Sequence, residues 1–184
     1  MQRIISLVAV LAVAAMPAFA PQTALAASAA ELNREAQSAL KALYAKAPAA
    51  RALSKKAKGI LVFPGIVKAG LIVGGQYGEG VLYKGGKVAG YYNTAGGSYG
   101  LQAGAQKFGY ALFFMKDSAL AYLGKSDGFE VGVGPSIVVM DEGMAKSTTT
   151  TTLQDDVYAF IFSQSGLMAG LGLQGNKITK LDKK

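Results

Sequence analysis

Three spacings in the chain have the letters of known catalytic or phosphate-binding motifs. Ser38 and Lys41 have the Ser-x-x-Lys spacing of serine acylases, in which a lysine on the next helical turn accepts the serine proton. The companion motifs SDN and KTG are absent from the chain. The pair also falls on an amphipathic helical pattern, so we interpret it as a coincidence on a helix surface.

The other two spacings resemble nucleotide-binding loops by letter. The sequence GLGLQG at 170–175 fits the dinucleotide fingerprint, which requires a following helix and an acidic residue about twenty positions further on. Only nine residues follow Gly175. The sequence LGKS at 123–126 matches the end of a phosphate-binding loop, but Ala119 stands where that loop needs its leading glycine. We therefore expect no nucleotide site.

Acid–base and metal chemistry lack their usual side chains. The chain has no His and no Cys, which excludes a Ser-His-Asp triad, a thiol nucleophile and a zinc site with the usual ligands. The carboxylate pairs Asp141–Glu142 and Asp155–Asp156 are neighbours in sequence, and such neighbours point to opposite faces of a strand. The sequence therefore predicts a protein that is not an enzyme and that uses no cofactor and no metal.

The densest glycine run, GGQYGEGVLYKGG at 74–86, also lacks a phosphate-binding context, because no Lys-Ser or Lys-Thr pair accompanies it. Its start returns as GGSYG at 96–100. Glycine within strands permits close backbone packing and sharp bending. We therefore predict that both copies belong to one sheet, with the second copy in a second hairpin.

Residues 27–58 have the pattern of two helices. Ser28 and Glu31 form a capping box, and Pro48 ends the first helix. Its apolar residues recur at spacings of three and four, which marks one helix face: Leu32, Ala36, Leu40, Leu43 and Ala47. A second helix over 48–58 has a cationic side, made of Arg51, Lys55 and Lys58, and an apolar side, made of Ala50, Leu53 and Ala57.

From Gly59 onwards the chain indicates strands. Fifteen of the 24 glycines lie between residues 59 and 109, interleaved with short apolar runs such as ILVFP, GVLY and YALFF. This pattern is typical of an antiparallel meander. Further on, we expect a short helix capped by Asp117 or Ser118, strands in FEVGV and GPSIVVM, and a loop or hairpin end over 146–156. Two buried strands joined through SQSG then lead to an exposed tail, TKLDKK.

The predicted fold class is therefore α+β, mainly antiparallel β. The meander is expected to form a closed or partly closed barrel, with two N-terminal helices and one short internal helix.

The first 26 residues predict export. Arg3 precedes an apolar run, and the small residues ALA at 24–26 form a cleavage site. We expect a signal peptide over 1–26, a helical segment over 27–58 and a glycine-rich β domain over 59–184, the last two forming one unit in the periplasm. An uncleaved membrane anchor is the alternative, although the apolar run is short for a spanning helix.

The charge of the chain favours an anionic partner, since 19 Lys and Arg stand against 11 Asp and Glu. A phospholipid surface or a polyanion would fit this balance, and a solvated basic surface with no partner explains it equally well. Most Tyr and Phe residues lie in apolar strand runs, where core packing accounts for them. We therefore expect no nucleic-acid binding.

Several motifs together carry a resemblance to one family. The segments AKGILVFPG, GGQYGEGVLY, GGSYGLQAGAQ, YALFFMKDSAL, GVGPSIVV and VYAFIFSQSGLMAGLGLQGNKI occur in this order. In order and spacing the chain resembles the SYLF domain family from about Leu53 to Ile178. The resemblance implies a lipid-binding module, with phosphoinositide membranes and actin as partners of eukaryotic relatives and export for bacterial ones. YYNTAGG replaces the Trp-Ser-x-Pro element of many relatives, and the signal peptide also argues against actin here.

We therefore expect a non-enzymatic module that adsorbs to anionic phospholipid through its basic helical segment. The predicted lipid-binding residues are Lys41, Lys46, Arg51, Lys55, Lys56, Lys58 and Lys68. An envelope scaffold that binds another protein is the alternative function, and a small outer-membrane barrel is a further structural alternative.

Overall fold

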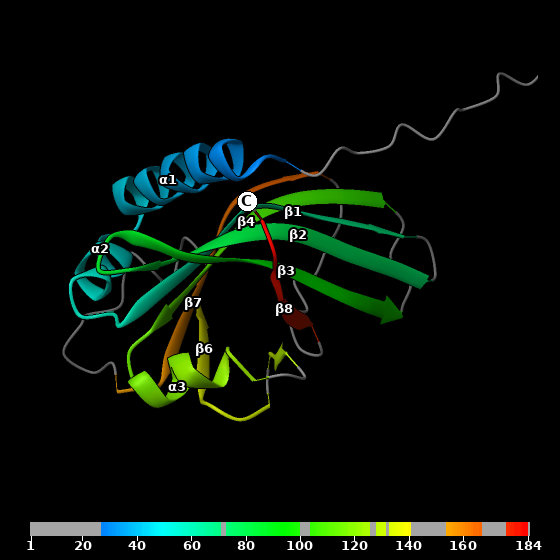
Figure 1. Cartoon of the computed structure of the whole chain (residues 1–184). Helices are drawn as coiled ribbons and strands as arrows, with labels where there is room; N and C mark the ends of the chain where they lie inside the picture. The colour runs from blue at the N-terminus through cyan, green and yellow to red at the C-terminus, as the bar shows by residue number, and fades with distance from the viewer. Residues whose placement is uncertain are drawn as a thin grey trace, which may run out of the picture.

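The computed structural model describes residues 27–70, 73–99, 104–125, 128–131, 133–140, 154–166 and 176–183. Eight strands form one sheet in the order β5-β8-β3-β2-β1-β4-β7-β6. The sheet curls into a half-barrel, with α1 across one face and α3 on the other (Figure 1). The predicted α+β class with mainly antiparallel strands is confirmed.

Two consecutive helices begin the described chain, α1 (Ala29–Lys46) and α2 (Pro48–Ser54). The Ser28 side chain accepts a hydrogen bond from the Glu31 backbone N–H at 3.2 Å, as the capping box predicts. Leu32, Ala36, Leu43 and Ala47 are buried, which confirms the apolar face. The second helix is shorter than predicted, because it ends at Ser54 and leaves the following lysines in a turn.

The next four strands are β1 (Gly59–Gly70), β2 (Val73–Lys84), β3 (Lys87–Tyr99) and β4 (Gly104–Phe114). Strands β1, β2 and β3 form the predicted antiparallel meander. Strand β4 instead pairs with the other side of β1. Leu61, Val62 and Phe63 are all buried in β1, so this strand has both faces covered and suits the middle of the sheet.

The two glycine copies lie in one hairpin and not in two, which corrects the prediction. Gly75 pairs with Gly97, and Gln76 pairs with Gly96, across β2 and β3. The hairpin turns at Gly85 and Gly86, whose φ angles of 55° and 78° are those of a type I′ turn. The two similar sequences therefore face each other because the turn lies midway between them.

The remaining elements are α3 (Asp117–Tyr122), β5 (Phe129–Glu130), β6 (Ile137–Met140), β7 (Val157–Gly166) and β8 (Lys177–Leu181). Strand β6 pairs in parallel with β7, so the sheet is mixed at this edge. Leu123 caps the C-terminal end of α3, which places the start of LGKS at a helix end. Most of 146–156, GLGLQG and residues 1–26 lie outside the described residues.

Several local predictions in this region are wrong. Helix α3 has Lys116 as its N-cap residue, with no side-chain capping hydrogen bond. Strand β7 continues through SQSG to Gly166, so SQSG is not the connection between two strands. The strand predicted in FEVGV is shortened to Phe129–Glu130, and Val133 of that segment is 49% exposed. The tail is largely exposed as expected, but it also contributes to the sheet, because Leu181 belongs to β8 and pairs with Tyr91.

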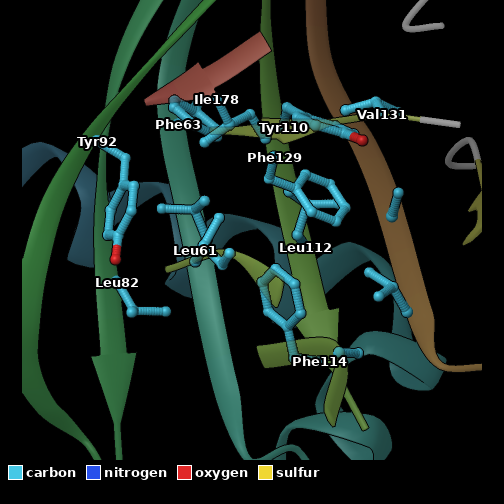
Figure 2. Packing of buried hydrophobic residues seen from close by; sticks show 14 of the residues in the cluster. Leu61, Phe63, Leu82, Tyr92, Tyr110, Leu112, Phe114, Phe129, Val131 and Ile178 are labelled. Atoms are coloured by element: carbon cyan, nitrogen blue, oxygen red, sulfur yellow. The ribbon is translucent and has the colours of Figure 1, made fainter. Parts of the chain in front are cut away.

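The core consists of two clusters, one on each face of the sheet. The inner face, which includes Phe63, Leu112 and Phe129, packs against α3 (Figure 2). The outer face, which includes Val62 and Phe113, packs against α1 and α2. Successive residues of β1 alternate between the two clusters, as the period of a strand requires. The half-barrel therefore presents two different surfaces, one beneath the helices and one inside its curve.

Candidate functional site

Polar contacts fix α1 over the hairpin of β2 and β3. The Tyr83 hydroxyl donates to Asn33 Oδ1 at 3.1 Å, and Asn33 Nδ2 donates to the Tyr91 hydroxyl at 3.3 Å. Burial raises the pKa of Tyr83, with a smaller contribution from Tyr91, so its hydroxyl keeps its proton and remains a donor. These contacts set the distance between α1 and the sheet, and thereby the width of the groove at their edge.

A groove of about 790 Å³ lies between α1, α2 and the β2–β3 turn. Lys41 lines it from α1, Arg51 lines it from α2, and Lys55 lines it from the turn after α2. Leu40, Tyr44, Ala57 and Ile60 supply apolar surface, and Gly85 and Gly86 complete the lining. No Asp or Glu of the described residues lines this basic groove.

Tyr44 links the groove to the outer core. Its ring lies 6.5 Å from the ring of Phe113 between centroids, in a tilted arrangement. Burial raises the pKa of Tyr44, while a hydrogen bond with Ser54 acts in the opposite direction. The Ser54 hydroxyl also donates to the Arg51 carbonyl oxygen at 2.8 Å, which closes the end of α2. Tyr44 thus adds a neutral aromatic surface to the groove that the cations line.

Two further lysines, Lys84 and Lys87, flank the glycines that line the groove, and both are exposed. They are not among the seven predicted lipid-binding residues, because they lie outside the helical segment. The sequence KGGK could have indicated these two lysines. Two glycines between apolar strand runs predict a two-residue turn, and such a turn brings the flanking lysines close together.

Of the seven predicted lipid-binding residues, the structure brings Lys41, Arg51 and Lys55 together in the basic groove. Lys46 and Lys56 are exposed at the ends of α1 and α2. The Lys58 amine lies 3.9 Å from Asp117 Oδ2, and both side chains are largely exposed, so this ion pair contributes little.

Lys68 does not belong with the other six, which corrects its assignment to one surface with them. It lies on β1, facing inward like Ile66 two residues earlier, and its side chain is 3% exposed. An inward-facing residue of β1 points away from α1 and α2, because those helices cover the opposite face of the sheet.

A second groove, of about 800 Å³, lies along the other side of α1. Its lining includes Glu35, Glu79 and Lys107, so its charge is mixed. Ser38 lines this groove whereas Lys41 lines the basic one, so the two residues of the Ser-x-x-Lys spacing border different surfaces. The mixed charge makes the second groove a poorer match for an anionic surface.

Within the described residues, His, Cys, Asp and Glu form no group of three or more that could hold a metal ion. None of the helices in the described ranges has both the length and the hydropathy needed to cross a membrane.

Residues 95–184 match the model of the Ysc84 family, described as Las17-binding protein actin regulator. No curated protein matches the chain. The match begins within β3, so every residue that lines the basic groove precedes it. It agrees with the SYLF resemblance of the sequence motifs. The match therefore supports the resemblance to the SYLF (Ysc84) family over residues 95–184.

Proposed function

We propose that the protein is a non-enzymatic module that adsorbs to anionic phospholipid through the basic groove. The convergence of Lys41, Arg51 and Lys55 on one groove with an apolar floor carries this proposal. Cations attract lipid phosphates, while the apolar floor suits the glycerol and upper acyl region of a lipid. The family match over residues 95–184 agrees with the SYLF resemblance, which implies a lipid-binding module.

The expected strength is that of reversible adsorption. Each Lys or Arg near an anionic membrane contributes about 1 kcal/mol, and salt screens this contribution. With Lys84 and Lys87 added to the three cations that line the groove, the total is about 5 kcal/mol, which corresponds to a dissociation constant of about 0.2 mM. We further propose that the mature protein acts in the periplasm, where the predicted signal peptide would deliver it.

Co-sedimentation with phosphatidylglycerol vesicles over a salt series tests the proposal. A triple variant with Lys41→Gln, Arg51→Gln and Lys55→Gln should lose about 100-fold in affinity, since three contributions of about 1 kcal/mol are removed. The matched control carries Lys125→Gln, Lys177→Gln and Lys180→Gln, which removes the same charge from exposed positions outside the groove. Equal binding to phosphatidylcholine, or equal losses in both triple variants, would contradict the proposal.

A protein-interaction module is the second candidate function, favoured by apolar surface next to the second groove. Val67 and Tyr77 face each other on β1 and β2, and their side chains are 51% and 49% exposed. Exposed apolar neighbours of this size suit a protein partner. Pull-down from periplasm should then recover the same protein with and without lipid, and Val67→Ser with Tyr77→Ser should abolish the recovery.

A further inference from the structure

The inner face of the half-barrel holds a row of polar side chains from four segments. Lys68 on β1 stands in register with Gln76 on β2 and with Gln106 on β4. Gln76 pairs in turn with Gly96 on β3, and Asn176 occupies the space that a side chain at Gly96 would need. The four side chains of this polar row are only 3%, 8%, 6% and 3% exposed, in the order Lys68, Gln76, Gln106, Asn176.

Three members of the polar row have buried atoms without a hydrogen-bonding partner among the described residues. Both side-chain amide atoms of Gln76 are unpartnered, as are Gln106 Oε1 and Asn176 Nδ2. Buried polar groups are almost always hydrogen-bonded, because desolvation without a partner is costly. Since these atoms come from three segments that meet in one row, we interpret them as ligand-binding groups and not as isolated packing faults.

The paired residues of neighbouring strands on either side of the polar row give it the shape of a site. On one side, Ile66 pairs with Phe108, and both are buried in the inner core, which forms an apolar floor. On the other side, Gly70 pairs with both Gly74 and Gly104. These three glycines place no side chain between the polar row and the nearby end of β1, β2 and β4. Within the described residues, the polar row is therefore bounded by apolar side chains on one side and by glycines on the other.

The chemistry of the row defines the ligand class. Lys68 supplies a cationic donor, and Asn176 Nδ2 and Gln76 Nε2 supply neutral donors. The amide oxygens of Gln76 and Gln106 are acceptors, and the row itself contains no carboxylate. Phosphate oxygens would satisfy the unpartnered amide donors of Gln76 and Asn176 and would be attracted by the charge of Lys68, whereas only a hydroxyl or amine would satisfy the two acceptors. A protonated amine would be repelled by the positive charge of Lys68. Hydroxyl groups are therefore the better donors for the two amide oxygens.

We propose that the polar row binds a phosphate ester that carries free hydroxyl groups, of which glycerol phosphate is a small example. Such a group occurs both as a soluble ester and as the headgroup of phosphatidylglycerol. The site lies on the face opposite to the basic groove and uses none of its residues. The two proposals can therefore be tested independently, and the failure of one does not contradict the other.

Isothermal titration of the purified protein with sn-glycerol 3-phosphate provides the first test. The ester should bind, inorganic phosphate should bind about tenfold more weakly or worse because it leaves the acceptors unmatched, and glycerol should not bind. A parallel titration with nanodiscs of phosphatidylglycerol identifies the source: saturation by the free ester indicates a soluble ligand, and saturation by nanodiscs alone indicates the lipid headgroup. Binding of neither would overturn the proposal.

A double variant separates binding from structure. Gln76→Leu with Gln106→Leu removes unpartnered atoms, so the unliganded protein should be as stable as the wild type or more stable, whereas affinity for the ester should fall about tenfold or more. Gln154→Leu changes an exposed glutamine and is the matched control. The triple variant of the basic groove should bind the ester as the wild type does. Unchanged affinity in the double variant would refute the site.

A measurement on the wild type avoids reliance on variants that fail to fold. The side-chain amide NMR signals of Gln76 and Asn176 should shift during titration with the ester, while that of Gln154 should not. A crystal structure grown with the ester should show it against Lys68. Ordered water alone in the row under these conditions would overturn the proposal.

Discussion

The amine of Lys183 lies 2.7 Å from Glu79 Oε2 and donates a second hydrogen bond, of 2.6 Å, to the carbonyl oxygen of Ala27. The side chains of Lys183 and Glu79 are only 12% and 13% exposed. This contact joins the segment after β8 to β2 and to the residues that precede α1. Because the pair is largely shielded from solvent, its loss should cost more than that of a surface ion pair.

Lys183→Met should therefore destabilise the protein. The change leaves Glu79 with the Tyr77 hydroxyl as its remaining hydrogen-bond donor, at 3.1 Å. We expect a loss of about 2 kcal/mol, which lowers the Tm by about 4–8 °C in a protein of this size. Thermal unfolding of Lys180→Met, an exposed lysine of β8, gives the comparison. A double-mutant cycle with Glu79→Gln should show coupling between the two sites, and additive effects would argue against the pair.

The turn lysines should strengthen adsorption although they lie outside the helices. Lys84→Gln and Lys87→Gln should each weaken binding to phosphatidylglycerol vesicles about fivefold, which is the effect of about 1 kcal/mol. The salt dependence should decrease at the same time, since fewer cations take part. A Lys177→Gln, Lys180→Gln variant has the same net charge as the Lys84→Gln, Lys87→Gln double variant. If it bound as weakly, net charge and not position would explain adsorption.

Two glycines of β2 should respond differently to alanine. A Cβ at Gly80 would lie 2.6 Å from Phe63 Cδ1 and from the Val62 carbonyl oxygen, so Gly80→Ala should cost about 1–3 kcal/mol by overpacking the inner core. At Gly75 the nearest atom to a Cβ is the Gly96 carbonyl oxygen, at 3.9 Å. Gly75→Ala should therefore change the free energy of unfolding by less than about 0.5 kcal/mol. Urea unfolding measures both, and equal effects would contradict the packing.

Asp156 should contribute to the acid dependence of stability. Its carboxylate lies 2.6 Å from the Lys116 amine and accepts the Ser136 backbone N–H at 3.1 Å, and these contacts lower the pKa of Asp156. The lowered pKa means that its contribution is fully present above the ordinary value of 3.8 and is lost as the pH falls through the folded-state pKa. The Tm of Asp156→Asn should therefore fall less between pH 5 and pH 3 than that of the wild type. An equal fall in the Tm of the wild type and of Asp156→Asn over this pH range would exclude this role.

Short-range sequence patterns predicted the N-terminal helix α1 well. The cap at Ser28 and the spacing of Leu32, Ala36 and Leu43 both depend on residues within a few turns, so α1 could be placed from sequence. Arg51 and Lys55 were chosen from the spacing of the expected helix over 48–58, and Lys41 was chosen because it lies nearby in the sequence. The approach of Lys84 and Lys87 depends on how the hairpin docks beside α1, and helix periodicity contains no information about that docking.

The polar row could not be read from the sequence for a different reason. The inward positions of β2 before Leu82 are Gly74, Gln76, Gly78 and Gly80, so this face has no apolar alternation to reveal it. Lys68 and Gln106 become neighbours only because β4 returns to β1 instead of continuing the meander. Register between distant strands depends on the packing of both faces, and a single pattern of residues does not specify it.

The strand order also has a consequence for the growing chain. Between Tyr91 and Ala95, the outer edge of β3 is covered by residues 177–181, which are translated long after β3 itself. Until that segment emerges, the backbone N–H and C=O groups of this edge are available to pair with another polypeptide. A stalled or truncated nascent chain would therefore present a template for self-association, and the docking of β8 would remove it.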